Sequence, residues 1–260
     1  MKYGILEDFK IYMIDTTHLR PNTAKIYYNK IDNLLEGQSL INTIEKFEIE
    51  KVMNNLSKIK YKNEFSQSKN ALMYFLEFAN IPLDERFSGQ INILERMTNK
   101  RYRKLKGADL KEIEQTINYL KNNKMKLSYQ ILLSTGLRVN ELSQIRKNDC
   151  TISDKDISFD FIGKGGRKEK SKITKEENNK LFETVKKLIE STGDESKVFY
   201  SANYLQQKSK EYGFQCHDLR RAFARMQYKK GKSKKEVQKE LRHSDEKTTD
   251  IYLKSKIKIE

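Results

Sequence analysis

One short segment constrains the fold of this chain more than any other, because it has the pattern of a half-buried β-strand. In Asp156–Ile162, polar and apolar side chains alternate. The glycine-rich segment Gly163–Arg167 predicts a turn, from which residues 168–173 return as a second strand. Elsewhere the apolar residues recur at helical spacing, and the chain contains 2 prolines. The sequence therefore predicts a mainly α fold with a small antiparallel β-sheet.

Helical periodicity dominates the first third of the chain. It is found in residues 24–35, with Thr23 as the predicted N-cap, in residues 44–59, and in the strongly apolar residues 68–78. We therefore expect residues 1–83 to form an all-helical domain.

A change in character after Pro82 predicts a domain boundary. The periodicity weakens, and we interpret residues 84–107 as a basic interdomain linker that leads into a second domain at residues 108–260. A helix is predicted to begin at Ala108-Asp109. The linker has two interpretations: a solvated connection, or a segment that lies along phosphates, which the net charge favours. The candidate DNA contacts here are Arg101, Arg103 and Lys104.

The charge balance of the chain indicates an anionic partner. The formal net charge is +16 and the isoelectric point is about 9.5, which favours nucleic acid or an anionic membrane. No apolar run approaches the roughly 20 residues of a membrane span, and the N-terminus lacks the apolar stretch of a signal peptide. We therefore expect a cytoplasmic, nucleoid-associated protein that binds DNA or RNA, with no membrane partner.

The remaining composition gives no indication of a metal. Cys150 and Cys216 lie far apart and are expected to be reduced thiols. Cys216 precedes His217, but no second closely spaced Cys/His pair completes a zinc site. The acidic residues are scattered and form no carboxylate cluster for magnesium.

Two arginines, two histidines and a late tyrosine form a set that can break a phosphodiester without a metal. Arginine suits this chemistry because its planar fork grips two phosphate oxygens. Arg138 follows Thr135-Gly136, which is predicted to end an apolar helix, and it shares a helical face with Glu141. Taken alone, this arginine and glutamate are better explained as an ordinary surface ion pair.

Similar alternatives apply to the other candidates. His217 and Arg220 share one helical face, which by itself is a solvated surface, while Leu219 and Phe223 face the core. Lys164 lies at the glycine-flanked tip of the predicted turn. This tip is either a plain hairpin turn in solvent or a flexible segment that extends into a groove to deliver a proton.

The tyrosine is the least distinctive member of the set. Tyr252 is one of 14 tyrosines, and composition does not select it. Thr248-Thr249 is predicted to cap a short helix that presents this tyrosine, with Ile251 and Leu253 as its anchors.

Together these segments resemble the tyrosine recombinase (phage integrase) family, in order and spacing, across residues 108–255. The helical N-terminal unit resembles the core-binding domain of the family, which implies a two-domain, Xer-like recombinase. The matching segments are Thr135–Leu142, Gly163–Gly165, His217–Arg221, Leu241–Ser244 and Ile251-Tyr252.

The resemblance implies a role for each candidate. Tyr252 attacks the scissile phosphate, forms a 3′-phosphotyrosyl link and releases a 5′-hydroxyl. Strand exchange then needs no ATP, metal or other cofactor. The implied partners are duplex DNA at inverted-repeat half-sites and three further copies in a homo-tetramer. The supporting roles are phosphate binding by Arg138 and Arg220, hydrogen bonding and proton transfer by His217 and His243, general acid catalysis by Lys164, and support of the first arginine by Glu141. The tentative DNA contacts are Arg167, Lys168, Arg221 and Arg242.

The chain departs from the family pattern at three points. Arg242 occupies a place where the family often has glycine. Eight residues follow Tyr252, which predicts weaker subunit coupling or coupling through another surface. The first unit is too short to include an additional arm-type DNA-binding domain, which favours the Xer-like organisation. Two alternative functions remain open: a non-catalytic DNA-binding regulator on the same fold, and a type IB topoisomerase-like relaxase.

Overall fold

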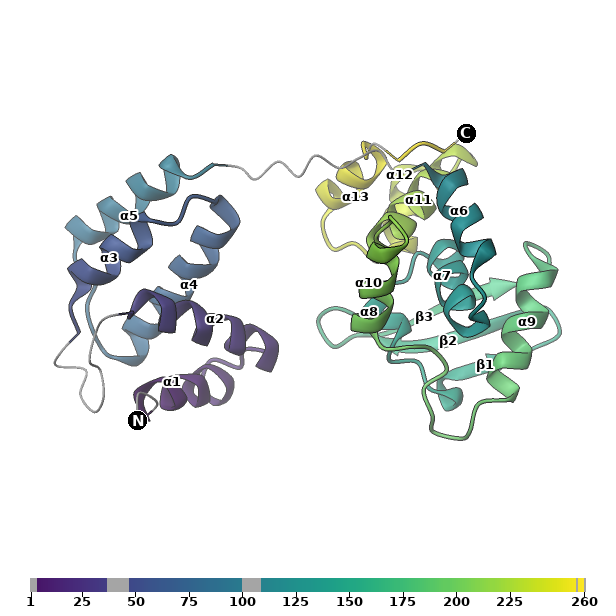
Figure 1. The fold of residues 1–260 in the computed structure, drawn as a ribbon, viewed down its shortest axis with the longest axis horizontal. Helices are drawn as coiled ribbons and strands as arrows, with labels where there is room; N and C mark the ends of the chain where they lie inside the picture. Colours follow the sequence, from purple (N-terminus) through teal and green to yellow (C-terminus); the bar gives the residue numbers. More distant parts are fainter. Residues whose placement is uncertain (1–3, 37–46, 100–108, 256, 260) are drawn as a thin grey trace. The chain divides into compact units, whose positions relative to one another are not determined.

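The structure, a computed structural model, describes residues 4–36, 47–99, 109–255 and 257–259 (Figure 1). They fall into two compact units, in residues 1–104 and 105–260, and each unit has its own hydrophobic core.

The described part of the first unit is helical, as the periodicity predicts. Phe9, Phe65 and Phe75 are fully buried in its core. The rings of Phe9 and Phe75 meet edge to face, with their centroids 5.3 Å apart. The helices are α1 (Gly4–Asp15), α2 (Pro21–Leu34), α3 (Ile49–Ser57), α4 (Lys62–Phe78) and α5 (Glu85–Met97).

The start of α2 differs from the prediction. Thr23 was expected to be the N-cap, but the helix begins at Pro21 and Arg20 is the N-cap. A proline is well suited to the first helical position because it lacks the N–H that would have no partner there. Thr23 therefore lies inside the first turn.

The prediction of a linker over residues 84–107 is wrong for residues 85–97, which form α5. Asp84 caps this helix by accepting a hydrogen bond from the backbone N–H of Phe87 at 2.8 Å. Ile91 is buried in the core of the first unit, and Lys69 of α4 pairs with Glu95 at 2.6 Å. Phe87 and Leu94 also pack against this core and lie at helical spacing from Ile91, so the apolar period of α5 was present in the sequence and was overlooked. The candidates Arg101, Arg103 and Lys104 lie outside the described residues.

The second unit combines helices with one three-stranded antiparallel sheet of order β1-β2-β3. Helices α7, α8 and α9 contact this sheet (Figure 1). The strands are β1 (Cys150–Ile152), β2 (Asp156–Ile162) and β3 (Lys168–Thr174). The helices are α6 (Leu110–Tyr119), α7 (Asn123–Thr135), α8 (Val139–Leu142), η2 (Lys147–Asp149), α9 (Asn179–Glu190), α10 (Ala202–Glu211), α11 (Cys216–Lys229), α12 (Lys234–Glu240) and α13 (Glu246–Leu253).

The predicted hairpin is present. Ile157, Phe159 and Phe161 of β2 are buried and share one face of the sheet, because side chains alternate along a strand. Ile157 pairs with Ile173 of β3 in the register. The short β1 was not predicted, since three residues are too few to show a pattern.

The turn after α7 requires a glycine. Gly136 ends the helix in the left-handed region, with a φ of 62°. A Cβ atom on this residue would lie 2.5 Å from Cδ1 of Phe223, a buried side chain of α11. The turn can therefore pack directly against α11, and this contact positions the next residues of α8.

We expect Gly136→Ala to lower the free energy of unfolding by about 2–4 kcal/mol, because left-handed strain and overpacking add together. Gly165→Ala is the matched control: its φ is 93°, but nothing lies within 4 Å of its Cβ position. The control substitution therefore adds backbone strain without overpacking. Urea unfolding of both variants measures the difference, and equal losses would contradict the packing argument.

Candidate active site

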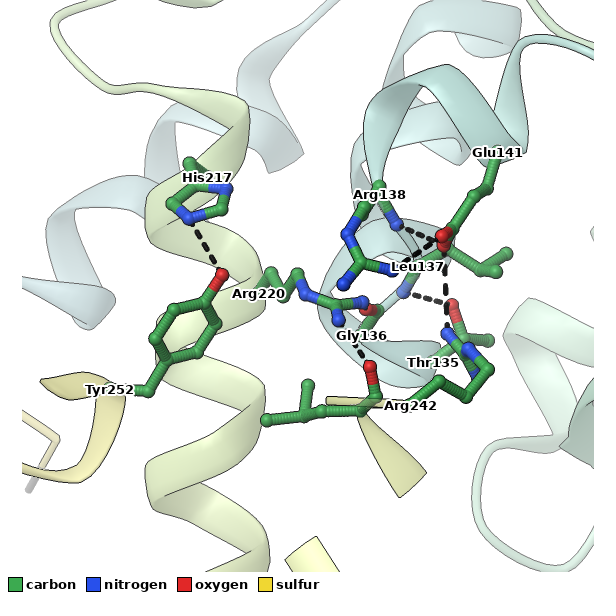
Figure 2. Close-up of polar contacts among 10 residues, drawn as sticks. Thr135, Gly136, Leu137, Arg138, Glu141, His217, Arg220, Arg242 and Tyr252 are labelled. Carbon is green, nitrogen blue, oxygen red and sulfur yellow. Dashed lines mark hydrogen bonds and ion pairs between the residues drawn. The ribbon is translucent and has the colours of Figure 1, made fainter. Parts of the chain in front are cut away.

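The packing of α13 against α11 brings Tyr252 to His217. Phe223, Leu241 and Tyr252 belong to one small apolar cluster that joins the last three helices. Tyr252 is 6% exposed. Its hydroxyl lies 2.7 Å from Nε2 of His217, and Figure 2 shows the two side chains pointing toward each other.

Arg220 is the most deeply buried charged side chain of the site, with 0% exposure. Its guanidinium donates to the backbone carbonyls of Gly136 and Leu241. These bonds connect α11 to the turn after α7 and to the end of α12. A buried charge is tolerated only when it is hydrogen-bonded in this way. Arg220 is therefore not part of a solvated helix face.

Arg138 and Glu141 form a tight pair at the start of α8. Oε1 of Glu141 accepts from Nη1 of Arg138 at 2.6 Å, and Oε2 accepts from the backbone N–H of Arg138 at 2.8 Å. The carboxylate is 5% exposed and the Arg138 side chain 28%. Both ends of the arginine are thus held by one acid, which fixes the direction of its guanidinium (Figure 2).

His243 completes the group from the loop between α12 and α13. Its ring meets the Tyr252 ring edge to face, with centroids 4.6 Å apart. Its Nδ1 lies 3.0 Å from Oγ1 of Thr249, which is fully buried.

Thr249 is a site residue that the sequence reasoning did not identify. The prediction that Thr248-Thr249 caps the last helix is wrong: Asp245 is the N-cap of α13, and Thr249 lies inside it. Thr249 precedes Tyr252 by three residues, and that spacing places both on one helical face. The expected anchor Ile251 is 64% exposed, so it does not anchor the helix, whereas Leu253 packs against the cluster.

The electrostatic environment keeps both histidines neutral at pH 7. Desolvation and the charges of Arg221, Arg220 and Arg138 lower the pKa of His217 to about 4. Burial and the charges of Arg220 and Arg138 lower the pKa of His243 to about 3. Burial and the neighbouring Arg138 lower the pKa of Arg220 to about 10, so this guanidinium stays charged. The site therefore offers neutral imidazoles beside fixed positive charge.

The depressed pKa of His243 predicts acid sensitivity. Below about pH 6.5 the His243 ring of the unfolded chain binds a proton, whereas the same ring in the folded protein stays neutral until about pH 3. The contribution of neutral His243 to the free energy of unfolding is therefore complete above pH 6.5. It is lost as the pH falls toward 3, by at most about 1.4 kcal/mol per pH unit. We expect His243→Gln to show a shallower decline in melting temperature between pH 6.5 and 4. Parallel curves for the two proteins would contradict this.

The turn residues are not brought into the cluster by any described contact. Lys164, Arg167 and Lys168 are exposed at the β2–β3 turn, and no hydrogen bond or ion pair among the described residues joins Lys164 to the other candidates.

Two tentative DNA contacts instead meet protein carboxylates. Arg221 pairs with Asp218 at 2.9 Å. Nη2 of Arg242 lies 3.7 Å from Oε2 of Glu141, and the Arg242 side chain is 13% exposed. The assignment of these two residues to DNA phosphates stays a prediction.

The segment after Tyr252 packs back onto the second unit itself. Ile257 is buried in the main core, and the backbone N–H of Leu110 donates to the carbonyl of Lys258 at 3.1 Å. Arg225 of α11 donates to the carbonyls of Ser255 and Ile257. Arg225 was also not identified from the sequence, since a side chain that binds carbonyls 30 residues away leaves no local pattern.

Within the ranges that the structure describes, no three His, Cys, Asp or Glu side chains gather into a group that could hold a metal ion. Among the same residues, no helix has both the length and the apolar character needed to cross a membrane.

Comparison with known proteins identifies the family. The model of the phage integrase family matches residues 103–258. The chain belongs to the phage integrase family. It is thus a site-specific DNA recombinase of the tyrosine recombinase class, as the motifs predict. The recombinase is 30% identical over 202 residues to the tyrosine recombinase XerA of Saccharolobus solfataricus, with 74% of this chain and 67% of the relative covered. It is 27% identical over 277 residues to a tyrosine recombinase of Pseudothermotoga lettingae, with 96% and 93% covered.

Solved structures share the fold of the recombinase. A lambda integrase dimer bound to a COC′ core site aligns with a TM-score of 0.67 at 17% identity, over 98% of each chain. The XerH recombinase bound to its difH substrate in a pre-cleavage complex aligns with a TM-score of 0.61 at 18% identity, over 89% of this chain and 74% of the other. These likenesses confirm the predicted mainly α fold with a small antiparallel sheet.

Proposed function

We propose that the recombinase cleaves and rejoins duplex DNA through Tyr252. The phenol oxygen bonds to the scissile phosphorus while the bond from phosphorus to the 5′-oxygen breaks. The products are a 3′-phosphotyrosyl link and a free 5′-hydroxyl. The observation that carries this proposal is the 2.7 Å contact between the Tyr252 hydroxyl and Nε2 of a neutral histidine, beside two arginines.

The proton of the nucleophile goes to His217. A neutral imidazole nitrogen at hydrogen-bond distance can accept the phenol proton as the P–O bond forms. The leaving 5′-oxygen needs a proton in turn, and we assign this role to Lys164, which the exposed β2–β3 turn can present to bound DNA. The phosphotyrosyl ester conserves the energy of the broken bond, so rejoining is the reverse attack and needs no ATP.

The negative charge on the oxygens of the pentacoordinate phosphorus is balanced by Arg138 and Arg220, and the neutral His243 donates a hydrogen bond. Nε of Arg220 and Nε2 of His243 are buried and have no hydrogen-bond partner within the described residues. When the Thr249 hydroxyl donates to Nδ1 of His243, Nε2 carries the ring proton and can donate to a phosphate oxygen. Fixed donors of this kind stabilise a transition state without reorganising. Glu141 keeps Arg138 in the same orientation.

Duplex DNA at inverted-repeat half-sites is the proposed partner, bound by a homo-tetramer of the recombinase. The net charge of +16 and the helical first unit support binding along phosphates. Two relatives of the same fold were solved on DNA, lambda integrase on its core site and XerH on difH. We propose the cytoplasm, in association with the nucleoid, as the site of action.

Salt dependence tests the phosphate contacts. If the recombinase neutralises 6–10 phosphates, its DNA affinity should fall by about 10³–10⁵-fold between about 50 and about 200 mM salt. Fluorescence anisotropy with a labelled duplex measures this slope. A nearly flat response would contradict extensive phosphate binding.

A trapping experiment tests the reaction itself. The Tyr252→Phe protein first selects its binding site from a random-sequence duplex pool, and the selected duplex is then nicked beside the scissile phosphate. The nick lets the short 5′-hydroxyl strand diffuse away, so wild-type protein should accumulate as a covalent adduct on a denaturing gel. Specific binding without an adduct would indicate a DNA-binding regulator. Relaxation of supercoiled DNA by monomers, without branched junction intermediates, would indicate a topoisomerase-like relaxase.

A further inference from the structure

Arg242 has an unusual backbone conformation at the centre of the site. Its φ is 54°, in the left-handed region that disfavours residues with a Cβ. The residue before it, Leu241, accepts a hydrogen bond from Arg220, and the residue after it, His243, packs on Tyr252. A glycine would adopt this turn without strain, so the turn alone does not explain an arginine here.

The side chain of Arg242 reaches the acid that orients Arg138. Its Nη2 lies 3.7 Å from Oε2 of Glu141, and its guanidinium lies over the Phe161 ring, 5.2 Å from the centroid. Figure 2 shows it extending toward Glu141. The side chain is 13% exposed, and its Nε and Nη2 have no hydrogen-bond partner in the described parts of the chain. One buried carboxylate is therefore shared between two arginines.

This arrangement gives Glu141 a second positive neighbour, at the carboxylate oxygen that does not bond the Arg138 guanidinium. One carboxylate oxygen bonds the Arg138 guanidinium, and the other accepts from its backbone and faces Arg242. A buried carboxylate that contacts two cations has fewer orientations open to it. The Phe161 ring, from β2, restricts the plane of the Arg242 guanidinium.

We propose that Arg242 is a positioning residue for DNA cleavage, which holds Glu141 and through it directs the Arg138 guanidinium at the scissile phosphate. This inference rests on the proposed cleavage reaction. It separates Arg242 from the arginines that contact phosphate directly, since its effect passes through Glu141. Loss of Arg242 should therefore slow the chemical step and leave DNA affinity unchanged.

The test compares Arg242→Met with Arg242→Lys on the nicked duplex described above. Both variants keep a long side chain and the same left-handed backbone, but methionine lacks the charge. In single turnover at saturating DNA, we expect Arg242→Met to slow adduct formation by about 10–100-fold, the usual effect of losing an orienting contact. Arg242→Lys should recover most of that rate. The dissociation constant and its salt slope should stay within about twofold of wild type for both.

Two further variants make the result decisive. Arg242→Gly relieves the backbone strain, so it should fold at least as stably as wild type and still cleave as slowly as Arg242→Met. In a Glu141→Gln background, removal of Arg242 should slow cleavage by less than about threefold, because residues that act through one contact are not additive.

Three results would overturn the inference while the wild type still forms its adduct. They are an unchanged cleavage rate in Arg242→Met and Arg242→Gly, a loss confined to DNA affinity with a smaller salt slope, and fully additive effects with Glu141→Gln. The second would make Arg242 a phosphate contact. Absence of an adduct with wild-type protein would instead overturn the proposed function and this inference together.

Discussion

Replacement of Tyr252 with phenylalanine removes the covalent DNA adduct, with a rate at least about 10⁴-fold below wild type. The phenol oxygen is the atom that bonds to phosphorus, and no other group can substitute at that position. The variant loses one 2.7 Å hydrogen bond to His217, worth about 1 kcal/mol, so it should fold and bind DNA normally. A denaturing gel with the nicked duplex measures the adduct, and anisotropy measures the binding.

Tyr228→Phe is the matched control for this variant. Tyr228 lies on α11 and is 53% exposed, so its hydroxyl is not part of the cluster and its removal should leave the adduct unchanged. An adduct that persists in Tyr252→Phe would place the nucleophile elsewhere. Loss of the adduct in both variants would indicate a general effect of removing tyrosine hydroxyls.

Arg220→Ala should damage both catalysis and folding, unlike the tyrosine variant. The fully buried guanidinium bonds the carbonyls of Gly136 and Leu241, and its loss leaves both without a donor beside a cavity. We expect the free energy of unfolding to fall by about 3–5 kcal/mol. Cleavage should fall by at least about 10²–10³-fold through loss of charge at the phosphate.

Arg220→Lys separates the two roles of this residue, because lysine keeps the charge but has no planar fork. It should remain folded and still cleave slowly. Arg221→Ala is the control for the neighbouring position: its loss leaves Asp218 with the hydrogen bond from the backbone N–H of Gln215, so the free energy of unfolding should fall by about 1–2 kcal/mol. Urea unfolding and single-turnover cleavage measure both effects. A stability loss for Arg220→Ala no larger than that for Arg221→Ala would contradict the structural role of Arg220.

The parts of the fold that the sequence predicted are those with short-range causes. The alternation in β2 and the start of α6 beside Asp109 depend on neighbours within a few residues. The contact of Arg138 with Glu141 follows from a spacing of three residues. Helix α5 was taken for a linker although Phe87, Ile91 and Leu94 recur at helical spacing and pack on the core, so here the pattern was present and was misinterpreted.

The parts of the site that the sequence did not predict depend on distant segments. The acceptors of Arg220 lie 84 and 21 residues away. Both are backbone carbonyls, which every residue has, so no sequence pattern identifies them. The approach of Arg242 to Glu141 was not predicted, because it depends on the conformation of the loop, and the assignment of Arg242 to DNA phosphates stays a prediction. The assignment of Lys164 came from the family motif and stays a prediction, since the turn that carries it is exposed.

The identity of the amino acid bonded to DNA tests the central claim most directly. Wild-type recombinase trapped on the nicked duplex is digested with protease and nuclease, and the nucleotide-linked peptide is sequenced by mass spectrometry. The account predicts a single linked residue, Tyr252, joined to a 3′-phosphate, with a free 5′-hydroxyl on the released strand. A link to any other residue, or a 5′-phosphate bond to Tyr252, would contradict it.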